Sequence, residues 1–263
     1  MKKGIISISI LTVLFLLSSY FNGLFFALFI SLIAVLSLRE LFIIRKGKNK
    51  LPIVIELLAY IIVVFFTLNN YDNSIYMIDY RLLSFLILVN LIPLIFINNK
   101  NIYNISDSLY VIGSTLCIGL TFNSLIMLRT YDLNYILYIF CITFFTDLFA
   151  YITGKLIGKI KLTSISQNKT LEGYIGGTIM GTFAPTMFFI STINTSLPVY
   201  AIVIITLFLS LLGQIGDLVF SFIKREFNIK NFSNVVPFAG GILDVIDSVI
   251  FITFGFIIVL SII

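Results

Sequence analysis

The chain has 263 residues, of which 59% are hydrophobic and only 11% are charged, whereas about 25% of residues are charged in an ordinary soluble domain. So few polar groups cannot cover the apolar surface of a water-soluble protein of this size, which excludes that class. The sequence contains no histidine, which excludes a Ser-His-Asp triad, a histidine general base and a histidine-ligated zinc site. The net charge is +5, and most of the basic residues lie in the loops between apolar runs. This distribution is not that of a nucleic-acid-binding surface, so we expect no nucleic-acid partner.

Apolar runs long enough to cross about 30 Å of hydrocarbon recur along the whole chain. They lie at approximately 5–20, 22–38, 52–68, 82–97, 108–128, 133–153, 173–193, 198–218 and 242–263. We therefore predict an all-α, polytopic integral membrane protein with about nine transmembrane helices. Because no linker separates the runs, one continuous membrane domain should combine a five-span N-terminal region (1–132) with a four-span C-terminal catalytic region (133–263).

The lysine and arginine residues are distributed unevenly between the two sides of these predicted spans. If the N-terminus is cytoplasmic, all of them except Arg81 and Arg129 fall on the cytoplasmic side. This is the asymmetry of the positive-inside rule. The sequence therefore predicts a cytoplasmic N-terminus.

The sixth run carries an acidic residue, Asp147, near its cytoplasmic end, and Tyr151 follows four residues later on the same helical face. An ionisable residue inside a span is usually paired or functional, and neutralisation by a neighbouring helix is the alternative interpretation. The loop that follows is basic, which positive-inside topology alone would explain. It ends in a cluster of hydroxyl, ammonium and carboxylate groups at Ser166, Lys169, Thr170 and Glu172.

Three glycines recur at four-residue spacing in the seventh run, at Gly173, Gly177 and Gly181. Small residues at this spacing let another helix approach closely. We therefore predict a helix-packing face here and assign these glycines no chemical role.

The eighth run contains Asp217, and Ser221 and Lys224 follow it at spacings of four and three residues. If this helix continues into the cytoplasm, the three side chains share one face. A carboxylate, a hydroxyl and an ammonium group should then point in the same direction.

The last run opens with Asp244 and Asp247, which follow the pair Gly240 and Gly241. One acid in a first helical turn is explained by capping and by the helix dipole. Two acids on one face, with Asp217 at a matching depth, repel one another unless a cation lies among them. Hard oxygen ligands that leave room for water and phosphate suit Mg²⁺, so we predict that these three aspartates form a magnesium site. Free backbone amides after the glycine pair should add an anion-binding element.

Cationic side chains flank this predicted metal site at Lys224, Arg225 and Lys230. They suit a polyphosphate that a metal ion bridges to carboxylates. The residues therefore favour phosphoryl or nucleotidyl transfer at the cytoplasmic face, with Asp217, Lys224, Asp244 and Asp247 as catalytic residues. A transporter is an alternative, but its acids would relay ions near the membrane midplane within inverted repeats, and the sequence has no such repeat.

Three stretches of this sequence resemble the CDP-diacylglycerol synthases, also called phosphatidate cytidylyltransferases. The first contains Asp147, Ala150, Tyr151, Gly154, Gly158, Ser166, Lys169, Thr170, Glu172, Gly173, Gly176 and Gly177. The second contains Gly216, Asp217, Ser221, Lys224 and Arg225, and the third contains Lys230, Pro237, Gly240, Gly241, Asp244, Asp247 and Ser248. Together the stretches cover roughly residues 140 to 255 in the order and spacing of that family.

The resemblance implies transfer of CMP from CTP to phosphatidate or a related lipid phosphate of the inner leaflet, giving CDP-diacylglycerol and pyrophosphate. It implies Mg²⁺ as cofactor, leaves an additional monovalent cation and a homodimer open, and places the active site on the cytoplasmic side of a bacterial plasma membrane. The implied metal ligands are Asp217, Asp244 and Asp247. The implied substrate-binding residues are Asp147, Tyr151, Ser166, Lys169, Thr170, Glu172, Ser221, Arg225, Lys230, Gly240 and Gly241.

The chain departs from the usual signature of that family at Asn231, Phe238, Ala239 and Val245. A catalytically impaired or regulatory paralogue that keeps the helical scaffold is therefore the alternative to an active cytidylyltransferase.

Overall fold

The structure is a computed structural model that describes residues 15, 17–20, 23–45, 51–69, 80–97, 103–163, 169–236 and 240–262. Over these residues every regular element is an α-helix, and the extended backbone is limited to two isolated antiparallel bridges, Lys161 with Thr170 and Val236 with Gly240. The all-α prediction is thus confirmed for the described part of the chain. The chain divides into two compact units: the first comprises residues 1–130 and 231–244, and the second comprises residues 131–230 and 245–263.

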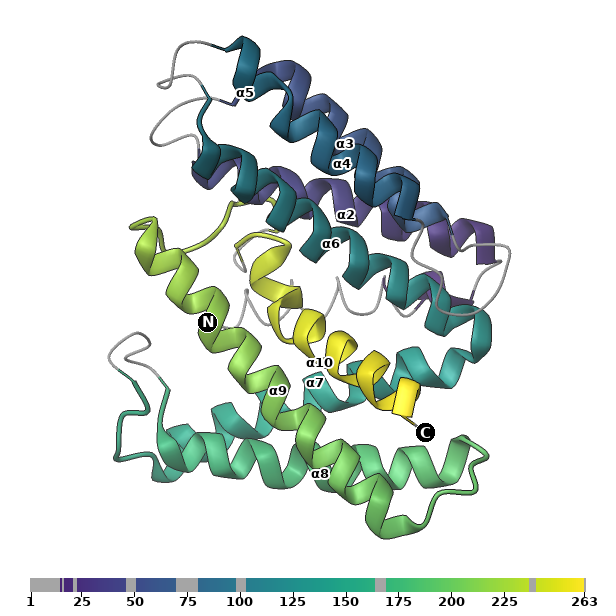
Figure 1. The fold of residues 1–263 in the computed structure, drawn as a ribbon. Helices are drawn as coiled ribbons and strands as arrows, with labels where there is room; N and C mark the ends of the chain where they lie inside the picture. Colours follow the sequence, from purple (N-terminus) through teal and green to yellow (C-terminus); the bar gives the residue numbers. More distant parts are fainter. Residues whose placement is uncertain are drawn as a thin grey trace. The chain divides into compact units, whose positions relative to one another are not determined.

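The first unit is built from the N-terminal helices (Figure 1). They are α2 (Gly23–Arg45), α3 (Ile53–Leu68), α4 (Tyr80–Leu91), α5 (Pro93–Phe96) and α6 (Ile105–Tyr131). Pro93 separates α4 from the short α5 and takes the first helical position of α5, where its missing N–H costs no hydrogen bond. Helix α6 is tied to α3, because the Asn123 side-chain amide donates to the carbonyl of Phe66 at 2.8 Å.

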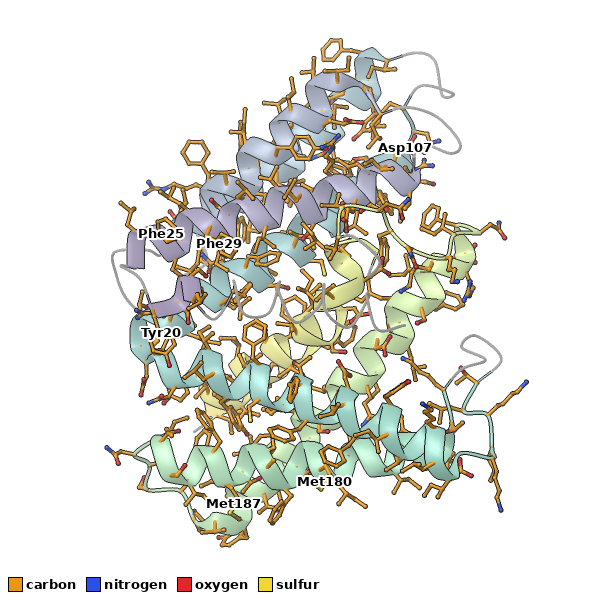
Figure 2. All side chains as sticks on the ribbon, turned by 180° about the vertical axis from the view of Figure 1, so that it is seen from behind. Tyr20, Phe25, Phe29, Asp107, Met180 and Met187 are labelled. Carbon is orange, nitrogen blue, oxygen red and sulfur yellow. The ribbon has the colours of Figure 1, made fainter. Side chains whose placement is uncertain are left out.

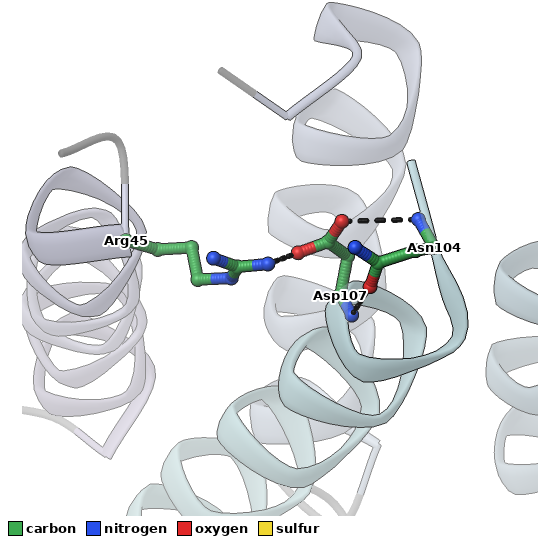
Figure 3. A network of polar contacts seen from close by, with 3 residues as sticks. All are labelled: Arg45, Asn104 and Asp107. Carbon is green, nitrogen blue, oxygen red and sulfur yellow. Dashed lines mark hydrogen bonds and ion pairs between the residues drawn. The ribbon is translucent and has the colours of Figure 1, made fainter. Parts of the chain in front are cut away.

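A polar network joins the end of α2 to the beginning of α6 (Figure 3). Arg45, in the last turn of α2, forms an ion pair with the buried carboxylate of Asp107. The other oxygen of Asp107 accepts a hydrogen bond from the Asn104 backbone N–H at 3.0 Å, and the Asn104 side chain accepts one from the Asp107 N–H at 3.0 Å. This reciprocal cap satisfies amides that the first turn of a helix otherwise leaves without partners.

The second unit contains α7 (Leu133–Ile157), α8 (Leu171–Thr192), α9 (Val199–Glu226) and the part of α10 (Leu243–Ile262) that begins at Val245. Helices α7 and α8 pack most extensively in this unit, and the glycines of α8 explain how. A Cβ on Gly177 would lie only 2.7 Å from the carbonyl oxygen of Thr146 on α7. The packing face predicted from the glycine spacing is therefore confirmed.

Polar side chains tie α7 to α9 inside the second unit. Tyr138 and Thr206 share a hydrogen bond of 2.7 Å between their hydroxyl oxygens, and Thr146 and Ser210 share one of 2.9 Å. All four residues are buried. Such pairs hold apolar helices together where burial of apolar surface against lipid gives little driving force.

Substituting Gly177 by alanine should lower the free energy of unfolding by about 1 to 3 kcal/mol, because the new methyl group meets a backbone carbonyl that cannot move aside. The measurement is thermal unfolding of the purified protein in detergent micelles. Gly113→Ala on α6 is the matched control, since a Cβ there meets nothing within 4 Å and helix propensity alone favours alanine by up to about 1 kcal/mol. Equal melting temperatures for Gly177→Ala and the wild type would contradict the packing argument.

Five helices of the described residues are long and apolar enough to cross a membrane: α2, α6, α7, α9 and α10. The predicted runs at 52–68 and 82–97 form shorter apolar helices, and the run at 173–193 forms α8, which is richer in glycine and threonine. The first predicted run, 5–20, lies almost entirely outside the described residues. Large apolar side chains such as Phe25 on α2 and Met187 on α8 are exposed, as Figure 2 shows, which is expected where lipid is the solvent.

Candidate active site

The second unit contains a cavity of about 310 Å³ that is lined by the first two of the three sequence stretches. Its lining residues are Asp147, Ala150, Tyr151, Gly154, Lys155, Leu162, Lys169, Thr170, Gly173, Tyr174, Gln214, Asp217 and Leu218. Helices α7, α8 and α9 and the segment between α7 and α8 all contribute. The structure thus brings five of the predicted site residues to one cavity: Asp147, Tyr151, Lys169, Thr170 and Asp217.

The segment between α7 and α8 doubles back on itself and delivers Lys169 to this cavity. The backbone N–H of Leu162 donates to the carbonyl of Lys169 at 2.9 Å, and that of Leu171 donates to the carbonyl of Ile160 at 2.9 Å. The Lys169 ammonium forms an ion pair with the carboxylate of Asp217 on α9. A lysine held by backbone pairing beside a cavity-lining aspartate is well placed to bind an anionic substrate.

Glu172 does not line the cavity, and its role in substrate binding stays a prediction. Its carboxylate oxygens accept hydrogen bonds from the Ile160 N–H at 3.2 and 3.3 Å, and so close the base of the segment that carries Lys169. Hydrogen bonds from its own backbone amide and from those of Lys159 and Ile160 hold the pKa of this carboxyl below its usual value. Ser166 lies outside the described residues.

Thr170 lines the cavity and also stabilises the start of α8. It is the N-cap of α8, and its hydroxyl oxygen accepts a hydrogen bond from the Gly173 N–H at 3.2 Å. A Cβ on Gly173 would lie 3.0 Å from this oxygen and 2.7 Å from the Ala150 carbonyl. The glycine and threonine of the first stretch therefore let the start of α8 lie directly against α7 below the cavity.

A cluster of acids with two lysines lies around the cavity in the second unit. Asp147, exposed to the cavity, interacts electrostatically with Asp217 and Lys169. Asp247, buried on α10, interacts electrostatically with Asp217, Asp147 and Lys224. The structure thus groups Asp147 with Asp217 and Asp247, whereas the sequence predicted Asp244 as the third acid. Over the described residues, no three acidic or cysteine side chains lie close enough together to ligate one metal ion directly.

Helix α9 continues to Glu226, past the end of its apolar part, as the prediction for the second stretch requires. Asp217, Ser221 and Lys224 therefore share one helical face. Ser221 and Lys224 are half-buried and do not line the cavity, while Arg225 and Lys230 are exposed. Asp217 thus lines the cavity, whereas Ser221, Lys224, Arg225 and Lys230, which were predicted to surround the triphosphate, do not line it.

The third stretch is organised in the first unit by a carboxylate that the sequence analysis overlooked. Glu40 on α2 is buried, and its side chain accepts hydrogen bonds from the Ser233 hydroxyl at 2.6 Å, the Ile242 N–H at 2.8 Å and the Leu243 N–H at 2.9 Å. It therefore caps the first turn of α10 from a position 203 residues earlier in the chain. A Cβ on Gly241 would lie 2.6 Å from Glu40 Oε2, which explains the glycine there.

These contacts correct the prediction of an anion-binding element after Gly240 and Gly241. The Gly241 N–H donates to Asp244 Oδ2 at 2.8 Å, and the next two amides donate to Glu40. The amides expected to be free are thus already occupied by carboxylates of the chain itself. Gly240 adopts a φ of +116°, a conformation that glycine tolerates.

Asp244 acts as a capping residue, because its side chain accepts a hydrogen bond from a backbone amide just before α10. Its Oδ2 also accepts a hydrogen bond from the Phe232 N–H at 2.9 Å, so it closes the loop that precedes α10. Its role as a metal ligand stays a prediction.

Two residues of interest were missed by the sequence analysis, Glu40 and Gln214. Glu40 lies just after the predicted run 22–38, although the apolar residues around it continue to the end of α2. That continuity was the available signal, since an acid within a long apolar helix is usually paired or functional. Gln214 lies one turn before Asp217 on α9 and lines the same cavity.

Comparison with known proteins agrees with the motifs. A sequence model described as the cytidylyltransferase family matches residues 2–263. The phosphatidate cytidylyltransferase of Staphylococcus haemolyticus is 34% identical over 262 residues, and those of Staphylococcus saprophyticus and Staphylococcus aureus (strain COL) are 33% and 32% identical over 254 residues. Each alignment covers 96% of this chain and 96% of the relative. The chain therefore belongs to the cytidylyltransferase family.

Proposed function

We propose that this protein transfers CMP from CTP to phosphatidate and forms CDP-diacylglycerol and pyrophosphate. The observation that carries the proposal is the cavity in which Lys169 pairs with Asp217 while Asp147 and Asp247 lie within electrostatic range. The match to the cytidylyltransferase family over residues 2–263 and the names of the three relatives support the reaction and its lipid substrate.

The reaction needs no histidine. A phosphate oxygen of the lipid attacks the α-phosphorus of CTP, a new P–O–P bond forms, and the bond from the α-phosphorus to the bridging oxygen of the β-phosphate breaks, so that pyrophosphate leaves. A phosphate monoester has a second pKa near 6, so about nine-tenths of it is already ionised at neutral pH. The protein has to position two anions and reduce their repulsion. Lys155 and Lys169 are the cations in the cavity lining, and Lys224 lies within electrostatic range of Asp247.

The residues present fit a magnesium ion. Mg²⁺ usually keeps several waters and binds through one or two carboxylates together with substrate phosphates, so it does not require three acids in direct contact. Asp217 and Asp247, from two different helices and within electrostatic range of each other, would hold it. Bound there, it would neutralise charge that develops on the phosphate oxygens.

We place the cavity on the cytoplasmic side of a bacterial plasma membrane, in a chain that crosses the bilayer nine times with its N-terminus inside. The distribution of lysine and arginine supports this topology. The five helices that are long and apolar enough to span support a chain that crosses the bilayer several times. The bacterial source of the relatives supports the location. The lipid phosphate then enters laterally from the inner leaflet, with its headgroup next to the lysines.

The proposed function is tested with purified protein in lipid nanodiscs, radiolabelled CTP, phosphatidate and a magnesium titration. We expect magnesium-dependent appearance of label in a lipid together with release of an equal amount of pyrophosphate. Binding of CTP without pyrophosphate release would support the non-catalytic paralogue instead. Conversion of a water-soluble phosphate monoester as fast as a long-chain phosphatidate would contradict lateral entry of a lipid.

Lys169→Ala should lower kcat/KM for CTP by about 10- to 100-fold, because it removes the ammonium group that is held in the cavity and leaves Asp217 without its partner. Labelled-lipid formation at several CTP concentrations measures this effect. Lys161→Ala is the matched control, since Lys161 lies on the same segment but is exposed and does not line the cavity. Equal losses in the two variants would mean that the segment contributes only general positive charge.

A further inference from the structure

Gln214 lines the cavity, and its side-chain nitrogen is hydrogen-bonded within the described part of the chain while its side-chain oxygen is not. It lies on α9 and is only 6% exposed. Its side-chain nitrogen donates to the hydroxyl oxygen of Thr178 at 2.9 Å and to the carbonyl oxygen of Tyr174 at 3.3 Å, both on α8. An amide nitrogen carries two hydrogens, so these two bonds use both of them.

The surroundings fix which way this amide faces. The Tyr174 carbonyl can only accept a hydrogen bond. The Thr178 hydroxyl donates its single hydrogen to the same carbonyl at 2.9 Å, so towards Gln214 it too can only accept. Both neighbours therefore require the nitrogen of Gln214, and the flipped amide would place its oxygen against two acceptors. Oε1 must face away from α8.

The oxygen left over is available to a ligand. Within the described part of the chain nothing donates a hydrogen bond to Gln214 Oε1. The fully buried side-chain oxygens that lack a partner there do not include this atom. It therefore retains accessible surface, and the space that Gln214 lines is the cavity of Asp147, Lys169 and Asp217. A hydrogen-bond acceptor with a fixed orientation faces into the proposed nucleotide site.

We propose that Gln214 Oε1 accepts a hydrogen bond from the 4-amino group of cytosine and thereby selects CTP over UTP. This inference rests on the proposed function. Cytosine and uracil differ at position 4, where cytosine carries an amino donor and uracil a carbonyl acceptor. A fixed acceptor binds the amino group of cytosine and repels the carbonyl oxygen of uracil. A buried polar atom that is left without its partner costs free energy, so the site discriminates strongly against uracil.

The position of Gln214 along α9 agrees with this assignment. It precedes Asp217 by three residues, so the two side chains share a face, with Gln214 one turn nearer the start of the helix. The triphosphate can therefore lie at Lys169 and Asp217 while the base reaches the acceptor on Gln214. Tyr151 and Tyr174 line the same cavity and offer flat aromatic surfaces to a base.

The test compares three nucleotides on the wild type and on variants of Gln214 and Thr178. CTP, UTP and the triphosphate of 2-pyrimidinone riboside, which lacks the 4-amino group, are each assayed for nucleotidyl transfer to phosphatidate. The wild type should prefer CTP over both others by at least about 10-fold in kcat/KM. Gln214→Met, which keeps the length of the side chain and loses the acceptor, should use CTP and the pyrimidinone nucleotide equally well, and its CTP/UTP ratio should fall at least about 10-fold.

The failures of this test are distinguishable. If Gln214→Met lowers kcat/KM for all three nucleotides by one common factor, Gln214 has a structural role only and the inference is overturned. Thr178→Val removes one of the two groups that orient the amide, so it should lower the CTP/UTP ratio in the same direction. An unchanged ratio there overturns the inference even if Gln214→Met does not fold. A wild-type protein that transfers no nucleotide at all would instead refute the proposed function.

Discussion

Asp247→Asn should reduce incorporation of labelled CTP into lipid by about 10²- to 10³-fold, the loss expected when one charge-stabilising group leaves a nucleotidyl-transfer site. The substitution preserves the shape of a buried side chain on α10 and removes its charge from a cluster that also contains Asp147, Asp217 and Lys224. One of the two carboxylates that we propose for magnesium is thereby lost. The measurement is initial-rate label incorporation at saturating phosphatidate over a magnesium titration.

Two control variants separate the loss of catalytic charge from the loss of a fold-stabilising acid. Asp132→Asn changes the N-cap of α7, where Asp132 accepts from the Asn134 N–H at 2.9 Å, and asparagine caps equally well, so activity should persist. Asp244→Asn keeps an oxygen for the Gly241 and Phe232 amides, so near-normal activity would mark Asp244 as a loop-closing residue, and a loss as large as that of Asp247→Asn would mark it as a metal ligand. Activity within a few-fold of wild type for Asp247→Asn would contradict its assigned role.

Glu40→Ala should destabilise the protein by about 3 to 7 kcal/mol, because each of the two buried amides that lose their acceptor costs about 1 to 3 kcal/mol and the half-buried hydroxyl donor costs about 1 kcal/mol. Those donors are the Ser233 hydroxyl and the backbone amides of Ile242 and Leu243. The loop before α10 and the first turn of that helix should loosen together. Thermal unfolding in detergent micelles and limited proteolysis of residues 231–243 measure the effect.

Ser233→Ala serves as the matched control for Glu40, since it removes only the side-chain hydrogen bond and should cost about 1 kcal/mol. Glu40→Gln should fall between the two, because it keeps one acceptor oxygen and turns the other position into a donor that faces backbone amides. A Glu40→Ala protein as stable as the wild type would show that these contacts are replaced by water without loss.

Local pattern was enough to predict the all-helical class, the glycine face of α8 and the family. Spacings of three, four and seven residues report which side chains share a helical face, so Asp217, Ser221 and Lys224 were grouped correctly. Gly177 could be assigned to packing for the same reason. These are statements about residues within one helix, and the physics of one helix fixes them.

Contacts between distant segments were beyond the reach of such patterns. Glu40 meets the amides of Ile242 and Leu243 only because the fold returns the chain to α2 some 200 residues later. The sequence therefore suggested an empty anion site at Gly241 where the chain supplies its own carboxylate. Asp147 was recognised as a functional candidate, yet its grouping with Asp217 and Asp247 depends on how α7, α9 and α10 pack in the second unit.

The contact between Lys169 and Asp217 means that these two charges neutralise each other in the resting site. A polyanion that draws the ammonium group to itself releases the carboxylate, and a cation that draws the carboxylate releases the ammonium group. Each ligand thus removes an obstacle to the other, and the gain in affinity is reciprocal by thermodynamic linkage. Nucleotide and metal should enter as a cooperative pair, and either one alone should bind weakly.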